Sequence, residues 1–247
     1  VESLYADRVR PYGRVLRKRL AEHAAASGRP AAEVDLDALQ AACSRCSWLR
    51  VQQEEGGEWS ALRKAVEDDF VDVYSQEDPY PAEMWAAAEA YFGSLAGADA
   101  AVLPGGRYAA ARVLASRDLP FLRGLSLGEL CHVVQLCIAP KKLLGYSSGT
   151  LVPYKVSQSK VKESLAERKS AVTVSKQGAV KYATWTSLRD CLQDLIRAAP
   201  ADAAAIPLSN IKRTFKARYN LELSETKLGH SKLSELMQDP ELQDLCA

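Results

Sequence analysis

The chain has 247 residues and a formal net charge of +1, and 47% of its residues are hydrophobic and 26% charged. These values are typical of a folded globular protein. No run of about 18 apolar residues occurs, which excludes a membrane-spanning helix. The six cysteines form no disulfide framework, so we expect reduced thiols in an intracellular compartment. The first residue is Val1 rather than Met, so an upstream targeting signal stays open.

Charge is distributed unevenly along the chain. Residues 1–30 carry seven basic and three acidic side chains, whereas residues 31–100 carry four basic and fifteen acidic ones. A basic segment beside an acidic block is typical of a surface that faces a polyanion next to one that faces solvent or a partner. Helices that simply carry solvated charge explain the same distribution, and the sequence leaves both interpretations open.

Residues 1–63 are expected to form a winged-helix-like module. Apolar spacing predicts a helix within 8–26 and a second helix over 36–46, with Asp35 or Asp37 as its N-terminal cap. Residues 49–62 alternate like two strands around a glycine-containing turn, which predicts a β-hairpin. The side chains expected to face inward on the two helices are Val15, Leu16, Leu20, Leu36, Leu39, Ala42, Cys43 and Cys46.

Two clusters in this part of the chain have the residue types of metal ligands. Cys43 and Cys46 have the spacing of half a zinc site, but a structural site needs about four ligands and no second pair exists. Asp68, Asp69 and Asp72 resemble the acidic clusters through which nucleases bind Mg²⁺. We expect two buried thiols and three solvated carboxylates, and no metal.

Residues 64–107 are expected to be a helical connector. The pattern predicts helix over 64–95, interrupted by Pro79 and Pro81, followed by a linker rich in glycine and proline.

Residues 108–154 are expected to form a helix plus a β-hairpin. Ser126 and Glu129 have the spacing of a capping box that opens a strongly apolar helix, and residues 142–154 predict the hairpin. His132 lies on the apolar face, where a hydrogen-bonded core histidine is more common than a ligand. Tyr146 and Tyr154 either stack on unpaired bases or are ordinary strand aromatics.

Residues 155–181 carry seven basic and two acidic side chains and are weakly patterned. They predict a basic linker with a short helix near 160–169. Such a segment attracts phosphates without reading sequence, and a merely soluble spacer fits equally well.

Residues 182–247 form the most clearly patterned module. One helix is predicted from Trp185 to Ile196 with an apolar stripe, and a second over 206–219. The second helix turns Leu208, Ile211 and Phe215 inward and exposes the cations Lys212, Arg213, Lys216 and Arg218. Gly229 is expected at a turn of positive φ, and Ser231 can cap a last helix that buries Leu233, Leu236 and Met237.

The stretch from Gly229 to Leu233 reads Gly-His-Ser-Lys-Leu, which suggests a hydrolase nucleophile. The nucleophile elbow needs glycine where Leu233 stands, and the sequence places no acidic residue to orient His230. No catalytic site is assembled elsewhere, so we expect no enzyme activity and no cofactor. If the protein were an enzyme, a nuclease would be the class that fits the sequence best.

The C-terminal module resembles the OST-HTH family, also called LOTUS domains, known from Oskar and tudor-domain germ-granule proteins. The resemblance follows Ile206–Ile211, Phe215, Leu221–Leu223 and Leu228–Met237, with His230 at the family's aromatic step. It implies a winged helix that binds RNA or docks a DEAD-box RNA helicase, here lacking the family's C-terminal wing. Residues 121–154 resemble a region that accompanies such domains in protist proteins.

The expected fold is therefore mostly α with short β-hairpins, arranged as tandem winged-helix-like modules. The expected function is non-catalytic RNA binding in RNA regulation or ribonucleoprotein assembly, in the cytoplasm or in ribonucleoprotein granules. An adaptor that docks a DEAD-box helicase or another assembly subunit is the alternative, and the acidic block favours it. The residues expected to contact RNA are Lys212, Arg213, Lys216, Arg218, Ser231 and Lys232.

Overall fold

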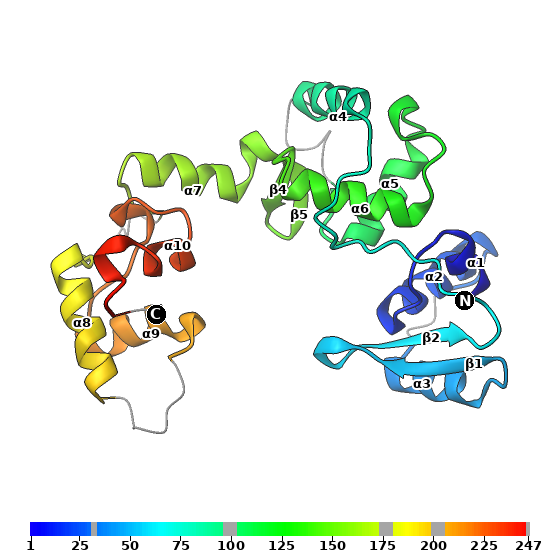
Figure 1. Cartoon of the computed structure of the whole chain (residues 1–247), viewed down its shortest axis with the longest axis horizontal. Coiled ribbons are helices and arrows are strands. Elements are labelled where there is room, and N and C mark those ends of the chain that lie inside the picture. The colour runs from blue at the N-terminus through cyan, green and yellow to red at the C-terminus, as the bar shows by residue number, and fades with distance from the viewer. Residues whose placement is uncertain (31–33, 96–102, 173–179, 199–205, 246–247) are drawn as a thin grey trace. The chain divides into compact units, whose positions relative to one another are not determined.

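The computed structural model describes residues 1–30, 34–95, 103–172, 180–198 and 206–245. It is mostly α-helical with two small antiparallel sheets, which confirms the expected fold class (Figure 1). The chain divides into two compact units, Val1–Tyr154 and Lys155–Ala247. Within the described residues, no helix has the length and apolar character needed to cross a membrane.

The first part of the N-terminal unit has the element order of a winged helix. Tyr12 forms a bridge with Ser60, so a short strand-like segment lies between the first two helices and pairs with the hairpin. The hairpin is antiparallel, with Leu49 opposite Arg63, as expected. The elements are α1 (Glu2–Ala6), α2 (Gly13–Ala26), α3 (Leu36–Arg45), β1 (Leu49–Gln53), the 3₁₀ turn η1 (Glu55–Gly57) and β2 (Trp59–Arg63).

Helix α3 begins where the sequence predicts, because the Asp35 side chain accepts a hydrogen bond from the Ala38 backbone N–H at 2.9 Å. The prediction for α2 is partly wrong. Leu20 is 44% exposed, and Arg19 is buried instead. The buried face of α2 runs through Leu16 and Arg19, because the Arg19 guanidinium donates to the Tyr108 hydroxyl at 2.9 Å within the interior.

Residues 64–81 are not helical, contrary to expectation. Side chains here bond to nearby backbone: Tyr74 N–H donates to Asp72 at 3.0 Å and Tyr80 N–H to Asp78 at 3.3 Å. Such local bonds compete with helix formation. Helix α4 (Ala82–Ser94) begins only after Pro81.

The acidic residues of this segment pair with the N-terminal segment and the hairpin. Asp68 accepts hydrogen bonds from Tyr5 at 3.0 Å and Arg50 at 3.1 Å, and Asp69 pairs with Arg8 at 3.1 Å. These carboxylates therefore neutralise cations of the same unit. No group of three or more candidate metal ligands occurs among the described residues.

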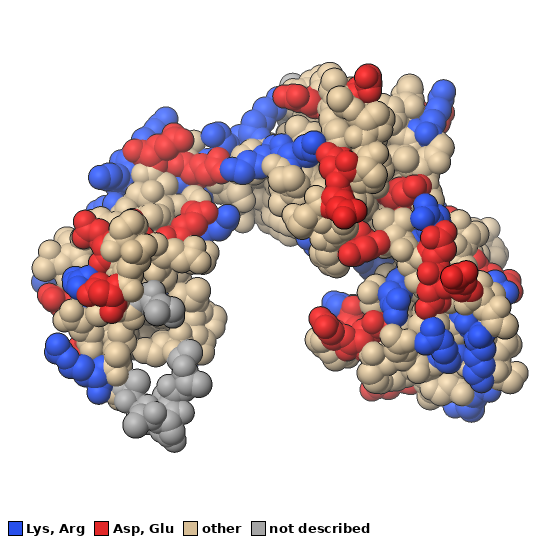
Figure 2. All heavy atoms as spheres, in the orientation of Figure 1, with Lys and Arg blue, Asp and Glu red and all other residues tan. Residues whose placement is uncertain are grey.

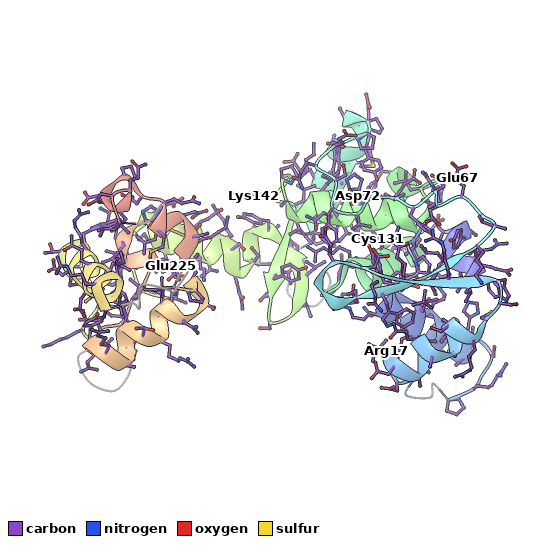
Figure 3. The ribbon with its side chains drawn as sticks, turned by 60° about the horizontal axis from the view of Figure 1, so that its bottom comes forward. Arg17, Glu67, Asp72, Cys131, Lys142 and Glu225 are labelled. Carbon is purple, nitrogen blue, oxygen red and sulfur yellow. The ribbon has the colours of Figure 1, made fainter. Side chains whose placement is uncertain are left out.

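The remainder of the N-terminal unit is built around a buried helix, α6. Ser126 and Glu129 form the predicted capping box, and residues Leu127–Cys137 are almost entirely inside the unit, as Figure 3 shows for Cys131. The elements are β3 (Leu103–Pro104), α5 (Arg107–Ser116), η2 (Pro120–Leu122), α6 (Leu127–Ile138), β4 (Leu144–Ser147), β5 (Thr150–Pro153) and η3 (Tyr154–Val156), with strand order β3-β5-β4.

His132 is the hydrogen-bonded core histidine that the sequence predicts. It is 4% exposed, and its ring nitrogens lie 3.1 Å from the Tyr80 hydroxyl and 3.1 Å from the Ser75 carbonyl oxygen. The imidazole thereby ties the irregular segment 64–81 to α6. The predicted hairpin of residues 142–154 is also present, with β3 as an added edge strand.

The C-terminal unit contains its own core, centred on Phe215, Leu188 and Leu236. Residues 155–181, interpreted above as a basic linker, contribute helix α7, which packs against the 3₁₀ helix η4. Residues 173–179 of this segment lie outside the described part of the chain. A parallel bridge joins Tyr182 to Glu222. The elements are α7 (Gln158–Glu167), α8 (Trp185–Ala198), α9 (Leu208–Tyr219), η4 (Thr226–Leu228), α10 (Leu233–Met237) and η5 (Pro240–Leu242).

Two apolar residues expected to face inward are exposed. Ile196 is 46% exposed and Leu208 is 43% exposed. The buried stripe of α8 runs through Leu188 and Leu195, and Ile196 lies a further 100° around the helix. Leu208 is the first residue of α9, one turn before the buried Ile211.

Candidate nucleic-acid interface

Gly229 has the backbone conformation that the sequence predicts. Its φ is 91° and its ψ 12°, in the left-handed region, directly after η4. No atom outside its immediate neighbours comes closer than 4.0 Å to a Cβ built there. The requirement for glycine is therefore conformational rather than steric.

The histidine and serine that follow Gly229 bind separate carboxylates. His230 Nε2 lies 2.9 Å from Asp239 Oδ2, and the Ser231 hydroxyl donates to Glu235 at 2.9 Å. Asp239 is thus a partner that the sequence pattern did not identify. No hydrogen bond joins Ser231 to His230 in the described structure.

The cap of α10 differs from the prediction. Lys232, not Ser231, is the N-terminal cap, and its backbone N–H donates to Glu235 at 3.1 Å. The Lys232 ammonium also pairs with Glu235 at 3.1 Å. The two residues expected to contact RNA at this helix start are therefore both held by one carboxylate.

The four cations of α9 do not form one face. Lys212 and Lys216 are one turn apart and lie side by side, whereas Arg218 lies on the opposite side of the helix and pairs with Asp194 of α8 at 2.9 Å. Lys216 pairs with Glu222 at 3.5 Å. Arg213 is exposed and forms no ion pair with any described residue.

Glu225 organises the cations on the Lys212 side. Its side chain is only 5% exposed and accepts from the ammonium groups of Lys212 and Lys162, the latter at 3.2 Å. Burial alone would raise the pKa of this carboxyl, but the bonds from Lys212 and Lys162 outweigh it and hold the pKa below its ordinary value. Both lysines remain more than 40% exposed.

These lysines line a groove of about 450 Å³ in the C-terminal unit. Figure 3 labels Glu225 at this place. The groove combines cationic side chains from α7 and α9 with apolar side chains from the segment between α7 and α8 and the segment between α9 and η4. The lining residues are Lys162, Ala171, Val172, Val180, Tyr182, Lys212, Lys216, Glu222, Leu223, Ser224 and Glu225.

Sequence reasoning identified Lys212 and Lys216 but missed Lys162 and Glu225. Lys162 lies in a weakly patterned segment, and Glu225 is one of many carboxylates in the chain. The two residues are recognised as partners only in the folded structure, where Lys162 and Glu225, 63 positions apart in the sequence, form an ion pair. Along α7, Lys and Arg interleave with Asp and Glu on the face shown in Figure 2.

The two tyrosines of the hairpin β4–β5 region, considered above for stacking on bases, already contact other residues of the N-terminal unit. Tyr146 is partly buried against the core of the N-terminal unit. Tyr154 is half-buried, and the Lys142 ammonium lies 5.6 Å from its ring centre. Both are therefore engaged within their own unit.

The hairpin β1–β2 carries three acidic and two basic side chains. Glu54 pairs with Arg10 at 2.7 Å, and Glu58 pairs with Arg14. Wings that contact nucleic acid carry cations for the phosphates. The cations of the hairpin β1–β2 are Arg50 and Arg63, and Arg50 already pairs with Asp68 at 3.1 Å.

The cysteines of the N-terminal unit are packing residues. Cys43 is buried, as expected, whereas Cys46 is only half-buried and lies just after α3 in extended backbone, contrary to the expectation of two buried thiols on one helix face. Burial raises the pKa of Cys131 and of Cys137 to about 12, so these thiols stay protonated.

Comparison with known proteins gives one family match. Residues 98–170 match the model of the OST-HTH Associated domain, over less than a third of the chain. No curated protein and no solved structure matches the chain. The matched residues run from the segment before β3 through α7. The chain therefore contains a region similar to the OST-HTH Associated domain, which is related to the LOTUS family but is not the LOTUS domain itself.

Proposed function

We propose that this protein is a non-catalytic RNA-binding protein that acts in RNA regulation or ribonucleoprotein assembly. In this proposal the C-terminal unit is a LOTUS-like winged helix and supplies the phosphate contacts. The match of residues 98–170 to a domain associated with OST-HTH proteins supports this class of function.

The observation that carries the proposal is the convergence of Lys162, Lys212 and Lys216 on one groove. Two helices supply these cations, and each ammonium is about half-exposed. Glu225 and Glu222 offset part of the charge, yet three cations face two carboxylates. Arg213, without an ion pair in the described structure, adds a further charge on the same helix.

Phosphate binding would draw on charges that are already positioned. A phosphate oxygen can accept from a lysine ammonium that keeps its bond to Glu225, because an ammonium has three donors. Each neutralised phosphate releases condensed counterions, which makes the affinity depend on salt. No base edge needs to be read for this part of the binding.

The test is a salt series of RNA binding by the full chain. Fluorescence anisotropy with a labelled single-stranded RNA would compare the wild type with the double variant Arg213→Glu/Lys216→Glu. We expect weaker binding, and a slope of log affinity against log salt that falls by about 0.7 for each lost contact. The control is Arg17→Glu/Arg197→Glu, which changes net charge equally at two exposed arginines (Figure 3 labels Arg17). Equal effects of the two variants would refute specific phosphate contacts.

A second candidate is a protein adaptor that docks a DEAD-box RNA helicase or another assembly subunit. The acidic block favours it, because the fifteen acidic and four basic side chains of residues 31–100 would repel RNA. Ile196 and Leu208 are the apolar side chains of the C-terminal unit at which docking can be tested, since they are 46% and 43% exposed. Lys216 pairs with Glu222 and Arg218 pairs with Asp194, so these two cations of α9 offer less net charge to RNA.

Pull-down of the full chain with and without RNase separates the two candidates. A partner that stays bound after RNase treatment, and is lost in Ile196→Asp/Leu208→Asp, would support the adaptor. A partner released by RNase would support RNA binding.

A further inference from the structure

The groove of the C-terminal unit is lined by both cationic and apolar side chains. Lys162, Lys212 and Lys216 supply charge, while Ala171, Val172, Val180, Leu223 and Tyr182 supply apolar surface. Val172 is 52% exposed, so part of this apolar lining is open to solvent. A site for inorganic phosphate alone needs no apolar lining, and a site for an apolar ligand needs no lysines.

Buried Glu225 fixes where the charge of the groove lies. Its two carboxylate oxygens each hold one ammonium, Lys162 on Oε1 and Lys212 on Oε2. Two cations from different helices are thereby kept close together around one anion. A phosphate that meets this pair encounters donors whose positions are already set, which lowers the entropic cost of binding.

The Tyr182 ring already holds a cation over one of its faces. The Lys227 ammonium lies 4.2 Å from the ring centre. Rings of this kind also pack against nucleobases, and such contacts tolerate any base because every base has a π-face. The groove volume of about 450 Å³ falls within the range of small-ligand sites, roughly 300–1,000 Å³.

These features together match one nucleotide in size and chemistry. A base inside a duplex is stacked on both faces and cannot lie against a groove wall, so only an unpaired base can use this lining. We infer that the groove holds one unpaired nucleotide of single-stranded RNA, with its phosphate on Lys162, Lys212 and Lys216 and its base against Val172, Val180 and Tyr182. The inference rests on the proposed function and names the part of the RNA that is bound.

The test uses the full chain and a fluorescein-labelled oligouridylate of eight nucleotides. Val172→Glu places a charge in the apolar lining, and Val161→Glu places the same charge at a valine that is 49% exposed on α7 and outside the groove. Both positions are exposed enough to keep the unit folded, which circular dichroism would verify. We expect Val172→Glu to weaken binding at least tenfold and Val161→Glu to change it less than twofold.

Ultraviolet crosslinking followed by peptide mapping gives a second readout. Crosslinks of the same oligouridylate in the peptides that contain Tyr182 or Val172 are expected. RNA binding with equal effects of the two valine variants and crosslinks elsewhere would overturn the groove assignment while leaving RNA binding intact. Absence of RNA binding by the wild type would overturn the proposed function itself.

A free nucleotide carries the same phosphate and base as a nucleotide of RNA, so both could bind this groove. Titration with each ligand distinguishes the two cases. We expect uridine 5′-monophosphate to bind at least a hundredfold more weakly than the oligouridylate, because neighbouring phosphates add contacts along the backbone. Equal affinities would show that the groove is a site for free nucleotides and would overturn the RNA assignment.

Discussion

Lys162 and Glu225 form an ion pair of 3.2 Å across 63 positions of the sequence. Lys162 lies on α7, within the region that matches the OST-HTH Associated domain, and Glu225 lies directly before η4. The matched region thus extends into the C-terminal unit rather than ending before it. Because the Glu225 side chain is only 5% exposed, removing one of its partners would leave a buried charge less well compensated.

Acidification should destabilise the C-terminal unit through Glu225. The pKa of this carboxyl is held below its ordinary value of 4.5, so it stabilises the fold at neutral pH, and this contribution is lost as the pH falls below 4.5 towards the folded-state pKa. Glu225→Gln should lower stability at neutral pH and flatten its dependence on acid. Hydrogen exchange of peptides from residues 206–245, measured over a pH series, would check this.

Glu235→Gln serves as the comparison for Glu225→Gln. The pKa of Glu235 is also lowered, although burial opposes this, by bonds from Ser231 and Lys232. Its side chain is 42% exposed, so solvent screens these bonds and the effect should be smaller. A larger effect of Glu235→Gln would contradict the central role of Glu225.

Gly229→Val should destabilise the C-terminal unit by about 1–3 kcal/mol, because a β-branched residue is strained at a φ of 91°. Gly229→Asn should cost less, since asparagine tolerates the left-handed region. Chemical denaturation followed by hydrogen exchange in residues 206–245 measures both. Equal loss in the two variants would point to a steric cause instead.

Gly128→Ala should destabilise the N-terminal unit by about 1–3 kcal/mol. A Cβ at Gly128 would lie 2.4 Å from the Arg8 carbonyl oxygen and 3.1 Å from Val71. The start of α6 and the segment after α1 would have to separate. Gly93→Ala in α4 is the control, because no described residue outside its own helix lies within 4 Å of a Cβ built there, and it should leave thermal unfolding unchanged or slightly improved.

Tyr80→Phe should cost about 1–3 kcal/mol in the N-terminal unit. Its hydroxyl lies 3.1 Å from the Glu129 carbonyl oxygen and 3.1 Å from His132 Nδ1, so the change leaves buried polar atoms without this partner. The control is Tyr74→Phe, whose side chain is 64% exposed. Denaturant unfolding of the two variants gives the comparison, and similar midpoints would show that the hydroxyl contact contributes little.

Local sequence was sufficient where a feature depends on a few neighbouring residues. The Ser126–Glu129 capping box, the two hairpins and the positive φ of Gly229 were predicted and are present, and Asp35 is one of the two residues predicted as the cap of α3. Each depends on hydrogen bonds or steric limits that span no more than a turn or a strand pair. These features therefore need no knowledge of the rest of the chain.

Tertiary structure decided every feature that depends on which partner meets a charged or apolar side chain. Residues 64–81 have a helical pattern, but Asp72 and Asp78 bond to the local backbone while Asp68 pairs with Tyr5 and Arg50. The long-range pairing of Asp68 and the local bonds of Asp72 and Asp78 together outweigh a helix propensity worth only fractions of a kcal/mol per residue.

The candidate site shows the same division. The sequence alone identified the cations of α9, since a charged residue on the polar face of an amphipathic helix is visible from its spacing. It did not show that Lys212 and Lys216 face a groove while Arg218 pairs with Asp194 on the other side. It also gave no sign of Glu225, because an electrostatic partner is chosen by distance in space, and α7 and η4 become neighbours only when the C-terminal unit folds.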